Sequence, residues 1–122
     1  MNRISFYVSC VFFALGTVGC AQMDQVQPVN TSQSRFVDAV YKGATTVISE
    51  NKDGLEEFRV FHQARSGFHE VNEVQASATA EVVRFCAMRN MRAVFFRETI
   101  STPPHVLGNF PRAEVIFGCV KY

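Results

Sequence analysis

The stretch that decides the fold runs from Glu70 to Asn90 and reads EVNEVQASATAEVVRFCAMRN. Its apolar side chains recur at steps of three and four residues, which places them on one stripe of an α-helix. Glutamates in the first turns and arginines in the last turns suit the helix dipole, and Asn90 suits the left-handed position that ends many helices. The stripe consists of Val71, Val74, Ala78, Val82 and Phe85, with Cys86 beside it. The pattern predicts one long amphipathic helix that packs on another layer.

Two stretches that follow this helix predict strands. Met91–Ile100 and Arg112–Val120 show the two-residue alternation that is typical of β-strands. In the second stretch, Val115, Phe117 and Cys119 share the more apolar face, and we expect the helix to pack on it. The sequence therefore predicts an α+β fold, with one long amphipathic helix on an antiparallel or mixed sheet of three or four strands and a βαββ core.

The residues before the helix predict a β-hairpin and a further short helix. Residues 44–50 are rich in β-branched side chains, Leu55–Gln63 alternate, and the turn signal Asn51-Lys52-Asp53-Gly54 lies between them. We therefore expect these two strands to pair directly. Residues 35–42 carry apolar side chains at the spacing of a short amphipathic helix.

The first 19 residues have the three parts of a secretory signal peptide. A basic start, Met1-Asn2-Arg3, is followed by the apolar run Ile4–Leu15 and then by small residues up to Gly19. The apolar run is shorter than the roughly 20 residues of a membrane-spanning helix. We interpret residues 1–19 as a signal peptide, and the alternatives are a marginal transmembrane anchor or an N-terminal core helix.

The segment ends at the four residues Thr17-Val18-Gly19-Cys20. They resemble the lipobox of bacterial lipoproteins, in which a cysteine thiol receives a diacylglycerol before cleavage. Val18 and Gly19 fit the pattern, whereas Thr17 departs from it because a leucine is usual there, so conventional cleavage nearby is the alternative. Ala21, rather than an aspartate, follows the cysteine, which in the lipoprotein sorting rule favours the outer membrane. The resemblance implies a chain with a lipid anchor on Cys20 that faces the periplasm.

The segment after Cys20 and the charge balance fit an anchored domain. Residues 20–34 are polar and rich in glutamine and serine, and we expect a lipidated flexible tether followed by a domain over 35–122. One of the 12 basic residues, Arg3, leaves with the signal peptide, so that 11 remain against 11 acidic residues. A neutral domain argues against a nucleic-acid partner. Because several acyl chains hold a protein firmly, the domain is expected to need no membrane-binding surface of its own.

The cysteines predict one disulfide. Cys10 leaves with the signal peptide and Cys20 receives the lipid, so Cys86 and Cys119 remain in a compartment that oxidises thiols. The helix stripe and the strand face place both sulfurs in one interface. Closing this loop would stabilise the fold by about 3–4 kcal/mol. The alternatives are a metal pair and a catalytic thiol, but there is no Cys-x-x-Cys motif, and two cysteines do not complete a zinc shell.

The loop from Ser101 to Pro111 is the candidate partner-binding segment. Its prolines restrict the backbone, which lowers the entropy cost of binding. The alternative is that its apolar side chains fold back and cap the core. The residues concerned are Pro103, Pro104, Val106, Leu107 and Phe110.

Catalytic and metal-binding patterns are not apparent in the sequence. The histidines are His62, His69 and His105, and a metal site would need them to converge with a carboxylate. The sequence has neither a Gly-x-Ser-x-Gly elbow nor a phosphate-binding glycine loop. We therefore expect no catalytic residues, no metal and no cofactor.

Several segments between Phe58 and Val120 form a distinctive set. They are Val83-Arg84-Phe85-Cys86, the strand after Met91, Pro103 to Arg112, in which Leu-Gly-Asn-Phe-Pro-Arg is most specific, and Glu114 to Cys119. Together they resemble a group of small, mostly uncharacterised proteobacterial outer-membrane lipoproteins. The resemblance implies an outer-membrane lipoprotein with a βαββ core, and it implies no activity. The layout is more loosely similar to the sensor lipoprotein of the Rcs envelope-stress pathway, which also joins a helix to a strand by a disulfide.

Together, these features predict a non-enzymatic envelope lipoprotein with an interaction, structural or stress-related role at the outer membrane, and with another envelope protein as a possible partner. The alternative is a periplasmic lipoprotein that binds a small ligand. That alternative predicts a preformed apolar pocket between the helix and the sheet.

Overall fold

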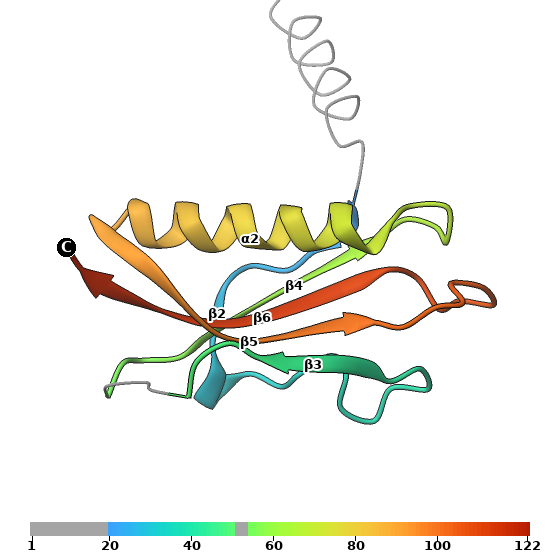
Figure 1. Cartoon of the computed structure of the whole chain (residues 1–122), viewed down its shortest axis with the longest axis horizontal. Coiled ribbons are helices and arrows are strands. Elements are labelled where there is room, and N and C mark those ends of the chain that lie inside the picture. Colours follow the sequence, from blue (N-terminus) through green and yellow to red (C-terminus); the bar gives the residue numbers. More distant parts are fainter. Residues whose placement is uncertain (1–19, 51–53) are drawn as a thin grey trace, which may run out of the picture.

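The computed structural model describes residues 20–50 and 54–122. In this part of the chain, one helix packs on a six-stranded antiparallel sheet (Figure 1), which confirms the predicted α+β class. The signal peptide predicted over 1–19 and most of the turn predicted over 51–54 lie outside the described residues. The strand order is β1-β4-β6-β5-β3, and β2 also pairs with β4. The elements are β1 Cys20–Met23, β2 Gln27–Pro28, the 3-10 helix η1 Val29–Thr31, β3 Gly43–Val47, β4 Phe58–Ala64, α2 Val71–Ala87, β5 Met91–Ser101 and β6 Arg112–Lys121.

Helix α2 forms where the apolar stripe predicts it, and it buries that stripe. Its buried side chains are Val74, Ala78, Val82 and Cys86, all at most 1% exposed. They pack on the face of β4 and β6 that carries Val60, Ala64, Ala113, Val115 and Phe117. Asn90 follows the helix with φ 57°, the left-handed conformation that asparagine adopts more readily than most residues. The prediction of one amphipathic helix on the sheet is therefore confirmed.

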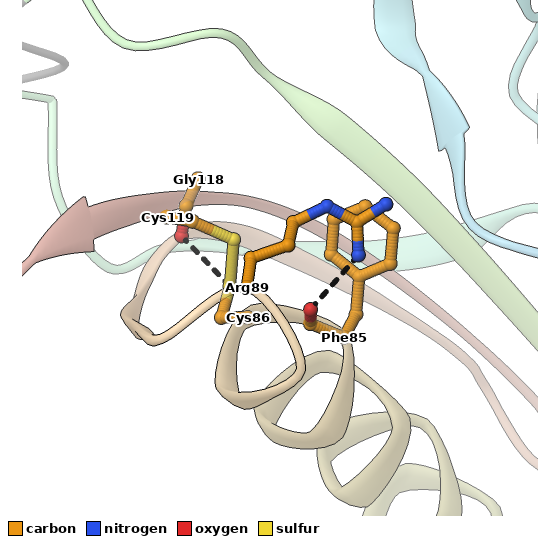
Figure 2. Close-up of a disulfide and its surroundings, with 5 residues drawn as sticks. All are labelled: Phe85, Cys86, Arg89, Gly118 and Cys119. Carbon is orange, nitrogen blue, oxygen red and sulfur yellow. Dashed lines mark hydrogen bonds between the residues drawn. A yellow bond between two sulfur atoms is a disulfide. The ribbon is translucent and has the colours of Figure 1, made fainter.

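The predicted disulfide is also confirmed. Cys86 on the last turn of α2 is bonded to Cys119 on β6, with 5.5 Å between the Cα atoms. Figure 2 shows this bond beside Arg89, whose guanidinium lies 3.6 Å from the centre of the Phe85 ring and donates to the Phe85 carbonyl at 3.0 Å. The disulfide joins the end of the helix to the final strand.

The predicted hairpin is wrong, although both of its strands exist. β3 pairs with β5 at the edge of the sheet, whereas β4 pairs with β6 and with the N-terminal strands. The reason is that β6 is buried on both faces from Arg112 to Gly118 and takes a central place, while most of β3 is exposed. A strand whose threonine side chains are exposed loses little burial energy when it lies at the edge of the sheet.

The short helix predicted over residues 35–42 is wrong as well. This segment forms turns, and Asp38 has a positive φ of 60°, which interrupts helical backbone. The apolar side chains of this segment therefore point in different directions and do not form one stripe. Phe36 packs on Phe61 of the sheet, with 6.2 Å between ring centroids, while Val37 and Val40 are exposed.

The flexible tether predicted over residues 20–34 is not what the structure describes. β1 and β2 pair with the outer edge of β4, and farther along Ser34 Oγ and the Arg35 amide donate to Glu114 Oε2 at 3.0 and 3.1 Å. Without β1 and β2, the backbone N–H and C=O groups along that edge of β4 would be unpaired. Such short strands need only their backbone hydrogen bonds to fill this edge. The sheet therefore begins at Cys20 and not at residue 35.

Candidate functional site

Three loops meet at one end of the sheet. The backbone pairs Gly43 with Ser101, and Gln63 with Arg112, so the chain leaves or enters four strands at the same end. We call this the loop end and define it as residues 36–42, 65–70 and 102–111. It is the right-hand side of Figure 1.

Hydrogen bonds link the first and third of these loops. The Tyr41 hydroxyl donates to the Leu107 carbonyl at 2.8 Å, and Thr102 Oγ1 donates to the Lys42 carbonyl at 3.2 Å. Asn109, which is 4% exposed, donates through Nδ2 to the Thr102 carbonyl at 2.9 Å. These bonds hold the proline loop in one conformation against residues 41–42.

The second loop packs on the third through Gly67. A Cβ built on Gly67 would lie 2.1 Å from the His105 carbonyl oxygen, so only a glycine permits this approach. His105 is itself held by Ser101, whose hydroxyl lies 2.9 Å from Nε2 and accepts a bond from the Arg112 amide at 2.9 Å. The three loops therefore form one connected surface.

Five large apolar side chains of this surface are exposed. They are Phe68 (100%), Val40 (91%), Leu107 (89%), Val106 (56%) and Val37 (53%). Removing one such side chain fully from water contributes about 1.5–3 kcal/mol. Leaving several of them in water at one end of a small domain indicates an interaction surface.

A groove runs between the first and third loops. It encloses about 460 Å³, and its apolar lining comes from Val40, Tyr41, Pro103, Pro104, Val106 and Leu107. The backbone of Leu107 has φ 54°, a conformation that bulky residues rarely adopt. Such strained positions concentrate at functional sites.

Sequence reasoning found part of this surface. Of the residues predicted in the 101–111 loop, Pro103, Pro104, Val106 and Leu107 are exposed, and Phe110 is partly buried. The alternative, in which these side chains cap the core, is therefore wrong for Val106 and Leu107. Val40 and Phe68 were missed.

A signal for these two residues exists in the sequence, but it is weak. Phe68 directly follows the break at Ser66-Gly67, and a large aromatic in a turn has no strand or helix face on which to be buried. Val40 was assigned to a helix stripe that does not form. Neither position stands out until the loops are placed beside one another.

A second cluster, which sequence reasoning also missed, lies between β4 and α2. His62 is 1% exposed, and its Nδ1 lies 2.9 Å from Ser77 Oγ, while its Nε2 contacts the Glu81 carboxylate. Ser77 and Glu81 are one helical turn apart, so both face the same imidazole. The grouping has the residue types of a hydrolase triad.

The geometry of this cluster favours a structural role. His62 is closed off from solvent, and the Ser77 hydroxyl contacts both His62 Nδ1 and, at 4.0 Å, Met23 Sδ of β1. Both ring nitrogens are engaged, which satisfies a buried polar side chain that would otherwise be costly. We interpret the cluster as a polar link between α2 and β4.

The other histidines lie apart from this cluster. His69 Nδ1 is 3.5 Å from Glu73 Oε2, and His105 bonds to Ser101. Among residues 20–50 and 54–122, no group of three or more histidine, cysteine or acidic side chains is arranged to hold a metal ion.

The opposite face of the sheet carries paired charges. Glu114 is 4% exposed and lies 3.6 Å from Arg59 Nε, and burial lowers the pKa of Arg112 from its ordinary value. A polar hollow of about 200 Å³ lies nearby, beside Arg35 and Arg59. Since Arg35 is paired with Asp24 at 2.8 Å, the hollow does not present a free cationic site.

Three cysteines are predicted site residues. Cys86 and Cys119 form the disulfide described above, and Cys20 is the predicted lipidation site. Its backbone begins β1 and pairs with Ala64 at the end of β4. Cys20 therefore lies at the loop end of the sheet.

No helix in the described part of the chain is long and apolar enough to cross a membrane. The chain matches no protein-family model, no curated protein and no solved structure. The resemblance to proteobacterial outer-membrane lipoproteins thus rests on the residues quoted for it above.

Proposed function

We propose that this chain is a bacterial envelope lipoprotein that is anchored at the outer membrane through Cys20 and acts by binding another envelope component with its loop end. The observation that carries the binding role is the exposure of Phe68, Val40 and Leu107, at 100%, 91% and 89%. Val40 and Phe68 lie on loops that each contact the loop of Leu107, so the three side chains belong to one connected surface.

Two independent features support export and lipidation. The sequence up to Cys20 has the signal and lipobox pattern, and Cys86 and Cys119 form a disulfide. Structural disulfides are typical of oxidising compartments such as the periplasm. The sequence pattern and the bond concern different parts of the chain and favour the same compartment.

The small-ligand alternative has less support. It requires an apolar pocket between helix and sheet, but that space is filled by side chains that are at most 1% exposed, among them Val74, Ala78, Val82, Val115 and Phe117. A ligand there would have to displace the core. We therefore favour binding at the loop end.

The anchor is tested by fractionating a bacterial host that processes lipoproteins. The full chain is expected in the outer-membrane fraction, and Cys20→Ser is expected to be absent from that fraction because it lacks the acyl chains that hold the protein there. Cys10→Ser is the matched control and should stay in the membrane fraction. Equal distribution of the full chain and Cys20→Ser would contradict the anchor.

The binding role is tested by carbene footprinting of the chain in intact cells and of purified chain without acyl groups in detergent-free buffer. Phe68 and Leu107 are expected to be labelled several-fold less in the envelope than in buffer, since a bound component covers them. Met88 and Val83, which are 77% and 51% exposed on α2, serve as controls and should be labelled alike in both. Full labelling of Phe68 and Leu107 in intact cells would contradict the proposal.

A further inference from the structure

The proposed lipid attachment point and the exposed apolar side chains lie at the same end of the molecule. Cys20 is the first residue of β1 and pairs with Ala64, the last residue of β4. The loop that carries Phe68 follows Ala64 directly. In Figure 1 the blue start of the described chain lies on the right, the same side as the loop end.

The distances between these points are short. Directly paired Cα atoms in an antiparallel sheet are about 5 Å apart. Phe68 is four residues beyond Ala64, which is at most about 14 Å of extended chain. Since Gly67 packs on His105 of the third loop, Leu107 belongs to the same region. A lipid on Cys20 would therefore enter the bilayer close to Phe68 and Leu107.

We propose that the loop end docks on the lipid bilayer that holds the anchor, with Phe68, Leu107 and Val40 entering its interface. This proposal rests on the proposed lipidation of Cys20 and names the component that the loop end binds. It replaces the expectation that the anchored domain needs no membrane surface. β1 begins at Cys20 itself, so no free tether separates the domain from the membrane.

The charges of the loop end favour an apolar mode of docking. Asp38 and Glu70 are exposed together with Lys42 and Arg65, so the ionised side chains of the three loops balance. Side chains such as phenylalanine and leucine enter the boundary of headgroups and acyl chains to a depth of about 5–10 Å. We therefore expect docking on zwitterionic lipid, with no requirement for anionic lipid.

Docking also orients the molecule. The C-terminus of α2, the disulfide and Tyr122 lie at the end of the sheet opposite the loop end (Figure 1). They point away from the bilayer in the docked state. Met88 (77% exposed) and Tyr122 (88% exposed) are therefore matched controls for the loop end.

The experiment uses tryptophan, because the chain contains none. Single variants Phe68→Trp, Leu107→Trp, Met88→Trp and Tyr122→Trp are purified as lipidated proteins and reconstituted in zwitterionic vesicles with or without brominated acyl chains. Bromine quenches tryptophan only on contact within the bilayer. We expect at least about a twofold loss of fluorescence for Phe68→Trp and Leu107→Trp, and little change for the two controls. Replacing part of the lipid by an anionic one should leave this pattern unchanged.

Each outcome decides a separate point. Acylated protein whose loop-end tryptophans are not quenched, or are quenched no more than the controls, overturns the docking and leaves the anchor standing. A mass without acyl chains overturns the anchor, and the quenching of that sample by vesicles then decides the docking by itself. Loop-end residues that are protected in cells but unquenched in pure vesicles identify a protein as the occupant and overturn the lipid proposal. Since Phe68 and Leu107 lie on different loops, misfolding of one variant leaves the other as a test.

Discussion

At the scale of single residues, the buried His62 shows how one side chain joins two layers. Its two ring nitrogens contact Ser77 and Glu81 of α2, while its backbone belongs to β4. The sequence does not reveal this, because a histidine in an alternating strand gives no sign of what lies opposite. Only the packing of α2 on β4 brings the three side chains together.

The first prediction concerns this link. His62→Ala leaves a cavity and removes the partner of Glu81, so we expect the free energy of unfolding to fall by about 2–4 kcal/mol in urea denaturation. Glu73→Gln is the control: the Glu73 side chain is 64% exposed and pairs with His69 only across 3.5 Å. It should change stability by less than about 0.5 kcal/mol. If His62→Ala unfolds at the wild-type urea concentration, the cluster does not link the layers.

Leu107 combines an exposed apolar side chain with strained backbone, and the second prediction separates the two. Asparagine tolerates the φ of 54° better than leucine does. We expect Leu107→Asn to keep or raise the melting temperature. We expect it also to weaken the association of the loop end with the lipid bilayer proposed above. The free energy of unfolding is expected to rise by at most about 1 kcal/mol, because the strain at this backbone position is relieved. Val83→Asn on the exposed face of α2 is the control and should leave association unchanged. A Leu107→Asn protein that is clearly less stable would show that Leu107 serves the fold.

At the scale of elements, the sequence predicts what each segment is better than what it neighbours. The helix and the strands around β3, β4, β5 and β6 are where alternation and the apolar stripe predict them. The β3–β4 hairpin is wrong, because alternation reports which face is buried and not which strand lies beside it. β1 and β2 are not predicted because they are only four and two residues long and are held by backbone bonds to β4, which leave no pattern in the side chains.

The disulfide cross-links the end of α2 to β6, and the third prediction concerns its contribution to stability. Replacing both Cys86 and Cys119 by alanine should lower the free energy of unfolding by about 3–4 kcal/mol, because a cross-link between residues 33 positions apart no longer restricts the unfolded chain. A reducing agent should cause a similar loss in the natural chain and none in the double variant. No difference between the oxidised natural chain and the double variant would contradict this contribution.

At the scale of the whole molecule, the ends of the sheet differ in character. One end combines the start of β1 at Cys20 with the exposed side chains of Val40, Phe68 and Leu107, and the other carries the disulfide and Tyr122. The sequence predicted the anchor and the proline loop separately. It could not place them at the same end, because that depends on the register of β1 against β4. The proposed membrane orientation follows from this juxtaposition.

The proposed location at the outer membrane depends on lipid at Cys20, and the mass of the mature chain purified from bacterial membranes tests for this lipid directly. We predict that the chain begins at Cys20 and that its N-terminal peptide carries a diacylglycerol and a further acyl chain, whereas Cys20→Ser carries neither. An N-terminus at another residue, or an unmodified Cys20, would contradict the lipoprotein proposal.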